Sequence, residues 1–205
     1  MANIPDSAFH QKLRADFKVF LWYVHQYLNL PEPTPLQYDI ADFLQYGKKR
    51  SCIQAFRGVG KSHITAAYVV WRLLCDAEAK IMVVSASKER ADAFSTFTQR
   101  LIWEMEGIEY LRPSSDQRQS KISFDVGPAT ASQSASVKSV GITGQLTGSR
   151  ADLIIADDIE VLNNVFTQTA RDRLSEAVKE FDAILKPLPT SRIIYLGTPQ
   201  NQESL

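Results

Sequence analysis

The sequence predicts an α/β protein with a mostly parallel sheet flanked by helices and an N-terminal helical extension. Apolar strand-like runs alternate with amphipathic segments from about residue 51 onward, and this alternation is typical of parallel strands joined by crossover helices. A glycine-rich turn separates the first strand from the next helix. With 44% apolar and 22% charged residues, the chain can build a sizeable core, which excludes disordered and collagen-like classes.

The first 47 residues form the predicted helical extension. Apolar residues recur at spacings of three and four over residues 7–28, which predicts one amphipathic helix. Three prolines then break it, because proline does not fit a helix interior: Pro31, Pro33 and Pro35. A second helix is expected over about 36–46, ending at Gly47. We therefore divide the chain into a helical segment, 1–47, and a larger core, 48–205.

Within the core, four buried strands and three helices are expected in alternation. The strands are 51–56, 80–86, 153–156 and 192–196, and the helices are 63–75, 88–105 and 167–185. The polar stretch 112–150 predicts two short strands on either side of a loop at 127–136. The sequence ends six residues after Pro199 with no closing helix, so we expect a core cut short at its C-terminal end.

The strongest local motif is a phosphate-binding loop between the first strand and helix. It needs glycines that let backbone N–H groups turn toward phosphates, a lysine for their charge and a hydroxyl for Mg²⁺. Ala55 occupies the place of the usual first glycine. The alternative is an ordinary glycine turn that caps a helix. Nucleotide contacts are expected from Gly58, Val59, Gly60, Lys61 and Ser62.

The second motif is a pair of carboxylates directly after the apolar strand 153–156. We expect Asp157 to hold Mg²⁺ and Asp158 to activate the attacking water, with Glu160 as its competitor because of its longer side chain. Taken alone, such a pair is more often a solvated turn. Its place downstream of a phosphate loop favours the catalytic interpretation.

Two arginines are candidates for stabilising charge on the reacting phosphate. Arg57 lies inside the phosphate loop, although a surface arginine that closes the loop is the alternative. Arg150 ends the glycine-rich loop before the carboxylate strand and could act in a neighbouring subunit. Pairing with Asp152, or plain solvation, is the alternative for Arg150.

Two further polar positions complete the candidate site. Gln37 precedes the phosphate loop, and its amide offers the donor and acceptor that reading an adenine edge requires. Thr198 and Gln200 follow the last strand, where a polar side chain can sense the terminal phosphate. A surface helix residue and a bare turn are the respective alternatives.

Net charge and hydropathy limit the kinds of partner and environment that the sequence allows. Lys+Arg and Asp+Glu both number 23, which argues against a permanent nucleic-acid coat protein but not against a machine that touches DNA locally. The sequence shows neither a signal region nor an apolar run of the ~18 residues that span a membrane. We expect a soluble cytoplasmic protein without membrane partners.

Together, these motifs resemble the ATPase half of bacteriophage terminase large subunits, a P-loop NTPase of the ASCE type. The closest resemblance is to the DNA maturase B proteins of short-tailed phages. It rests on Gln37, residues 57–62, Ser85-Ala86-Ser87, residues 144–150, residues 157–160 and Gly197-Thr198-Pro199-Gln200. The family's nuclease half is absent, so nuclease activity is not expected.

The resemblance implies an ATP-driven motor that moves double-stranded viral DNA into a procapsid, with ATP and Mg²⁺ as cofactors. It also implies a homo-oligomeric ring on the procapsid, a small terminase subunit and a portal protein as partners, and action in the host cytoplasm rather than in the mature virion. Position by position, Gln37 is similar to the adenine reader and Thr198 to a member of the coupling motif. Asp158 stands where many relatives have glutamate, which leaves the water activator open.

Two other functions fit parts of the pattern. A DEAD-like helicase shares an upstream glutamine, a phosphate loop and a carboxylate pair, but needs a second motor domain for which no sequence remains. A nucleotide-binding assembly module with little activity alone is the second alternative.

Overall fold

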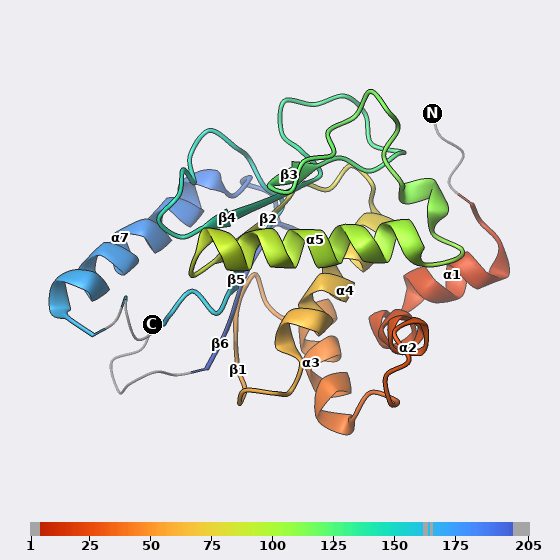
Figure 1. The fold of residues 1–205 in the computed structure, drawn as a ribbon, viewed down its shortest axis with the longest axis horizontal. Helices are drawn as coiled ribbons and strands as arrows, with labels where there is room; N and C mark the ends of the chain where they lie inside the picture. Colours follow the sequence, from red (N-terminus) through yellow and green to blue (C-terminus); the bar gives the residue numbers. More distant parts are fainter. Residues whose placement is uncertain (1–4, 162–163, 165, 199–205) are drawn as a thin grey trace.

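The computed structural model describes residues 5–161, 164 and 166–198, so the predicted coupling residue Gln200 lies outside the described residues. Six strands form one sheet in the order β1-β6-β5-β2-β4-β3 (Figure 1). β3 pairs antiparallel with β4, and every other pairing is parallel. The bounds are β1 Arg50–Gln54, β2 Ile81–Ser85, β3 Ser123–Phe124, β4 Val137–Gly141, β5 Leu153–Asp157 and β6 Arg192–Gly197.

Helices cover both faces of this sheet. They are α1 Ala8–Ala15, α2 Phe17–Tyr27, α3 Pro35–Tyr46, α4 Lys61–Cys75, α5 Lys88–Glu104 and α7 Gln168–Ile184, with a short 3₁₀ helix, η1 Glu109–Leu111. Alternate residues of β5 join two apolar clusters, with Ile155 on the side of α4 and α5 and Ile154 on the side of α7. Figure 1 shows α5 crossing in front of the strands. The predicted α/β class with a mostly parallel sheet is confirmed.

The prediction of a single helix over residues 7–28 is wrong. The chain leaves the helix at Asp16, whose φ of −144° and ψ of 121° are extended. Its carboxylate accepts a hydrogen bond from the Lys18 backbone N–H at 2.8 Å, so Asp16 caps α2 in the way that short acidic side chains favour. The apolar spacing continues across this break, because both helices turn an apolar face to the same core.

α1 and α2 pack on the core through α4. The Phe17 ring lies 5.1 Å from the ring of Tyr68 and 5.5 Å from that of Trp71, between centroids. The Trp71 indole N–H donates to the Leu13 carbonyl at 2.9 Å, so a buried polar atom is satisfied across the contact. These contacts hold the helical extension against the helix that follows the phosphate loop.

The strand order decides which side chains can meet. β6 lies between β1, which leads into the phosphate loop, and β5, which ends in the carboxylates. Ser85, at the end of β2, is in register with Asp157, at the end of β5. Asp157 has the same parity as Ile155, so its side chain faces the layer of α4 and α5. The carboxyl ends of the strands therefore bring both motifs to one edge, as parallel α/β sheets do.

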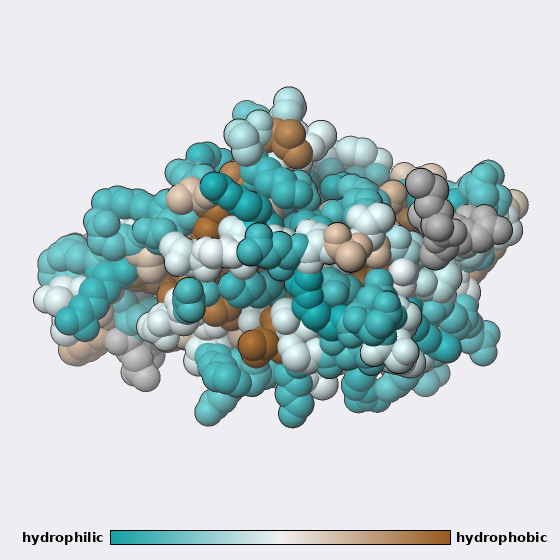
Figure 2. Space-filling model, turned by 90° about the horizontal axis from the view of Figure 1, so that it is seen from above, coloured by the Kyte–Doolittle hydropathy of each residue, from teal (hydrophilic) through white to brown (hydrophobic). Residues whose placement is uncertain are grey.

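Figure 2 shows one face of the molecule, on which hydrophilic residues dominate and hydrophobic ones form only small separate spots. Scattered apolar residues of this kind are normal on soluble surfaces. Among the helices of the described residues, none is both long and apolar enough to cross a membrane.

Candidate active site

The phosphate loop owes its shape to two glycines with left-handed backbone angles. Gly58 has φ +96° and Gly60 has φ +86°, values that other residues adopt only with strain. Gly60 also precedes α4 directly, so the loop ends on a helix N-terminus. This arrangement leaves backbone N–H groups available to an anion.

Lys61 is fully engaged within this loop. Its ammonium donates to the Ala55 carbonyl at 2.7 Å, to the Phe56 carbonyl at 3.2 Å and to the Thr198 hydroxyl at 3.0 Å. Only 6% of Lys61 is exposed. Thr198 in turn donates to the Ala55 carbonyl at 3.0 Å. The strand-end threonine that we expected to sense phosphate thus contacts the lysine that we expected to bind it.

Gln37 ties α3 to the phosphate loop. Its amide nitrogen donates to the Val59 carbonyl at 2.9 Å, and its amide oxygen accepts from the Thr34 N–H at 2.8 Å, as part of a capping box. Gln37 therefore lies at the loop, as a nucleotide contact requires. The structure does not test its role as adenine reader.

Asp157 lies at the buried end of β5, with 6% of its surface exposed. Burial raises its pKa from 3.8 to about 6, and the nearby Asp158 charge raises it too. The Ser62 hydroxyl and the positive charges of Lys61 and Arg90 lower the pKa and partly oppose this. The protein therefore holds a carboxylate where an ion of positive charge would stabilise its ionised form.

The residues fit a magnesium ion. Asp157 Oδ1 is buried and has no hydrogen-bond partner, and the hydroxyl of Ser62, the other predicted magnesium ligand, lies beside the same carboxylate. Carboxylate and hydroxyl oxygens are hard donors of the kind that Mg²⁺ takes, together with water and phosphate oxygens. Within the described ranges, no group of three or more His, Cys, Asp or Glu is arranged to hold a metal ion.

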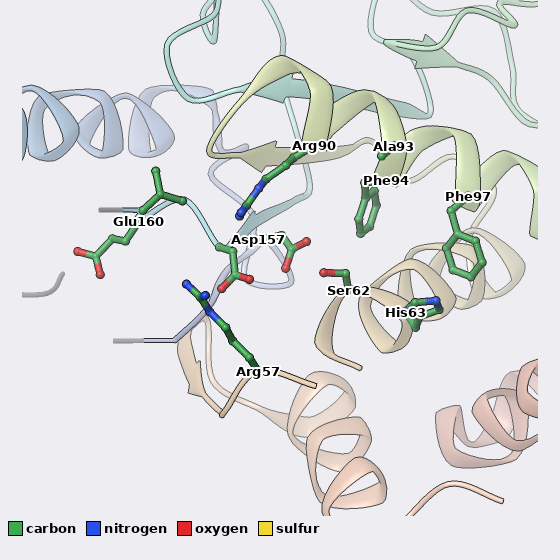
Figure 3. Close-up of a pocket in the computed structure, with 11 residues that line it drawn as sticks. Arg57, Ser62, His63, Arg90, Ala93, Phe94, Phe97, Asp157 and Glu160 are labelled. Carbon is green, nitrogen blue, oxygen red and sulfur yellow. The ribbon is translucent and has the colours of Figure 1, made fainter. Parts of the chain in front are cut away.

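Asp158 and Glu160 both line the cavity in front of Asp157. Asp158 has φ +46°, and its backbone N–H donates to the Leu196 carbonyl at 2.8 Å. This strained angle turns the chain out of β5 at the predicted water activator, and such strain often occurs at functional sites. Figure 3 shows the Glu160 carboxylate directed away from Asp157.

One cavity of about 580 Å³ brings together five of the predicted residues. It is lined by Arg57, Ser62, Asp157, Asp158 and Glu160, together with His63, Arg90, Ala93, Phe94, Phe97 and Val161 (Figure 3). Sequence reasoning missed the second group as site residues. The His63 ring of α4 and the Phe97 ring of α5 pack edge to face with centroids 4.9 Å apart.

Arg57 and Arg150 lie at different ends of the sheet. Arg57 reaches into the cavity from the phosphate loop. Arg150 precedes the amino end of β5, and its guanidinium donates to the Ala183 carbonyl of α7. Asp152, the alternative partner of Arg150, pairs instead with Lys186 at 2.9 Å. The structure does not bring Arg150 into its own subunit's cavity, and its action in a neighbouring subunit stays a prediction.

The sequence comparison identifies a relative over nearly the whole chain. The chain is 57% identical over 195 residues to the terminase large subunit of Enterobacteria phage T3. The chain is homologous to part of a terminase large subunit. The match covers 95% of this chain and 33% of that protein, so the chain spans about a third of the length of this relative. No family model matches the chain.

Solved structures of packaging proteins share the fold of this terminase homologue. The large terminase of bacteriophage HK97 matches 92% of the chain, with a TM-score of 0.55 at 16% identity, over 37% of its own length. A variant of the ATPase domain of the Thermus phage P74-26 large terminase gives 0.53 at 14% identity, over 87% of this chain and 70% of that one.

A third structural relative has nearly the same extent as this chain. The N-terminal domain of the DNA packaging ATPase from bacteriophage phi29 gives a TM-score of 0.51 at 15% identity, over 80% of this chain and 81% of that domain. At these identities the likeness shows the fold alone.

Proposed function

We propose that the chain is the ATPase part of a motor that packages viral DNA, and that it hydrolyses Mg-ATP at the cavity of Figure 3. The observation that carries the proposal is the convergence of the phosphate loop and the β5 carboxylates on one cavity. Homology to a terminase large subunit supports the same role. The strand order supports the proposal as well, because β6 alone separates the two strands that carry the motifs.

The phosphate loop binds and orients the substrate. Backbone N–H groups of residues 58–62 surround the phosphates, and Lys61 exchanges its carbonyl partners for phosphate oxygens. Arg57 stabilises negative charge as it develops on the terminal phosphate. Because these groups are already in place, catalysis depends on positioning and charge rather than on a covalent enzyme intermediate.

The carboxylates act on the metal and on water. When bound, Mg²⁺ would neutralise charge on the phosphate oxygens, and the Ser62 hydroxyl and Asp157 would hold it. Asp158, or Glu160 in its place, orients the attacking water and accepts its proton. The water oxygen forms a bond to the terminal phosphorus while the bond to the bridging oxygen breaks, which gives ADP and phosphate.

The motor assembly belongs to the proposal as well. We expect a ring of subunits on the procapsid, with a portal protein and a small terminase subunit as partners and double-stranded DNA as the cargo. In such a ring, Arg150 is the residue that we propose to act in a neighbouring subunit's site; in its own subunit its guanidinium donates to the Ala183 carbonyl. The host cytoplasm is the proposed place of action, and Gln200 with Thr198 the proposed coupling residues.

Substitution of Lys61 by alanine tests the ATPase assignment. We expect phosphate release to fall below about 1% of the native rate, because the charge that binds the terminal phosphates is lost. Lys179→Ala is the matched control, since Lys179 lies on the surface of α7 in a pair with Glu176. Native turnover by Lys61→Ala, with the same melting curve as the native chain, would mean that the phosphate loop is misassigned.

The same assay separates the alternative functions. Phosphate release is measured with and without double-stranded DNA over a range of protein concentrations. A specific rate that rises with protein concentration supports an arginine supplied by a neighbour. Strand separation would favour a helicase, and nucleotide binding without turnover under every condition would favour an assembly module.

A further inference from the structure

Arg90 stands at the start of α5, on the far side of the carboxylates from the phosphate loop. α5 follows β2, and β2 lies beside β5 with Ser85 and Asp157 in register. The Ser87 hydroxyl caps the helix by accepting from the Arg90 backbone N–H at 3.3 Å. Sequence-distant elements thus bring this arginine to the cavity that we assign to the nucleotide.

The neighbouring strand fixes the position of this helix start. A Cβ atom at Gly141, the last residue of β4, would lie 2.8 Å from the Lys88 backbone nitrogen and 2.9 Å from the Ser87 carbonyl carbon. Only glycine lets the turn before α5 approach β4 so closely. The backbone that carries Arg90 is therefore held against the sheet, while its long side chain remains exposed.

The Arg90 guanidinium reaches into the cavity without a direct partner. In the described part of the chain it makes no hydrogen bond or ion pair, whereas Arg100 on the same helix pairs with Glu104 at 2.8 Å. Figure 3 shows its nitrogen end extending from α5 toward the carboxylates, across from Arg57. It is close enough to help lower the pKa of Asp157.

The position of Arg90, in the first turn of α5, is also unusual for a positive side chain. Positive side chains in the first turn oppose the helix dipole. Lys88, in the same turn, is compensated by Asp92 one turn later, at 2.5 Å. Glu89 is the acidic residue of this turn, but Arg90 forms no ion pair with it or with any other described residue, and functional sites are places where such local rules are broken. An anion in the cavity would supply the missing partner.

A guanidinium binds phosphate with two parallel hydrogen bonds and keeps its charge at any working pH. The triphosphate lies along residues 58–62 in the proposed function, so its terminal phosphate points to the carboxylate side of the cavity. Arg57 approaches that point from the phosphate loop and Arg90 from α5. The two positive guanidinium groups thus face a single phosphate position from opposite sides.

We propose that Arg90 binds the terminal phosphate of the nucleotide opposite Arg57 and so determines the preference of the site for a triphosphate over a diphosphate. This inference rests on the proposed ATPase function. It adds a substrate contact from α5 that belongs to the same subunit as the phosphate loop.

Binding measurements on Arg90→Gln test the inference. Dissociation constants for a slowly hydrolysed ATP analogue and for ADP are measured with Mg²⁺ by calorimetry on the native chain and the variant. We expect Arg90→Gln to weaken binding of the analogue at least tenfold and to change ADP binding less than twofold. The affinity of Arg90→Lys for the analogue should lie between those of the native chain and Arg90→Gln, since lysine keeps the positive charge but lacks the planar guanidinium.

Arg100→Gln is the matched control on the same helix and should change neither constant. If Arg90→Gln leaves the ratio of the two constants unchanged, or weakens both ligands equally, the inference is overturned. Equal affinity of the native chain for both ligands would overturn it too. The Lys61→Ala variant distinguishes failure of this inference from failure of the proposed function. If that variant bound both ligands as tightly as the native chain, the phosphate-loop assignment itself would be wrong.

Discussion

The two sides of the candidate site, which we call its walls, differ in how far the protein satisfies its own polar groups. On the phosphate-loop wall, Lys61 and Thr198 bond to each other and to the Ala55 carbonyl. On the carboxylate wall, Asp157 Oδ1 and the Ser85 hydroxyl are buried without a hydrogen-bond partner. One wall is stable in the absence of ligand, whereas the other is costly until a cation and its water arrive.

This difference predicts opposite signs for substitutions on the two walls. Removing a polar group from the phosphate-loop wall should lower the free energy of unfolding of the ligand-free chain. Removing one from the carboxylate wall should raise it, at the expense of function. We expect the change in stability to be greatest for Asp157→Asn, smaller for Thr198→Val and least for Ser85→Ala.

Asp157→Asn should stabilise the ligand-free chain most, while abolishing ATP turnover. The gap between an Asp157 pKa of about 6 in the folded chain and 3.8 as its ordinary value corresponds to roughly 3 kcal/mol. Between these values the folded chain holds more protons than the unfolded one. Native stability therefore falls as pH rises through about 6, and the gain from Asp157→Asn should be larger at pH ~8 than at pH ~5.

Urea unfolding at both pH values measures this gain. Asp152→Asn is the control with the opposite sign, because the Asp152 carboxylate has Lys186 and the Lys80 backbone N–H as partners. A loss of stability in Asp157→Asn at pH ~8 would refute the contrast between the walls.

Thr198→Val should destabilise the ligand-free chain by about 1–2 kcal/mol. The valine cannot donate to the Ala55 carbonyl or accept from the Lys61 ammonium, both at 3.0 Å. Thr198→Ser keeps the hydroxyl and should retain most of the stability. Thermal unfolding of the two variants gives the comparison, and equal melting temperatures for both would show that the hydroxyl contributes nothing.

Ser85→Ala should have the smallest effect, a gain of up to about 1 kcal/mol. The substitution removes a buried hydroxyl that has no partner. Ser95→Ala is the matched control, since the buried Ser95 hydroxyl accepts from the Gln99 amide at 3.2 Å and its removal should destabilise. Chemical unfolding at neutral pH measures both, and a loss in Ser85→Ala equal to that in Ser95→Ala would count against the contrast.

Most of the fold could be predicted from the sequence because apolar periodicity and turn residues act locally. The predicted strands and the helix after the phosphate loop appear within a few residues of their expected bounds. The break at Asp16 was missed because a capping aspartate, not a proline or glycine, makes it. A capping aspartate does not change the spacing of the apolar residues around it, so that spacing cannot reveal the break.

The residues of the candidate site also divide into those that the local sequence reveals and those that it does not. Motifs of adjacent residues, such as 57–62 and 157–158, could be found from the sequence. Arg90 and His63 could not, because the order β1-β6-β5-β2 that brings their helices together is set by packing of the whole sheet. One local feature of the sequence points to Arg90: it is a cation in the first turn of a helix, where the helix dipole disfavours positive charge.

The end of β6 is bonded to both walls at once. The Gly197 carbonyl accepts from the Ala55 N–H at 3.2 Å, and the Leu196 carbonyl accepts from the Asp158 N–H at 2.8 Å. The segment that leads into the phosphate loop and the turn at Asp158 are thus hydrogen-bonded to consecutive residues of one strand. Displacement of either segment would therefore disturb a hydrogen bond at the end of the same strand, which couples the two motifs through β6.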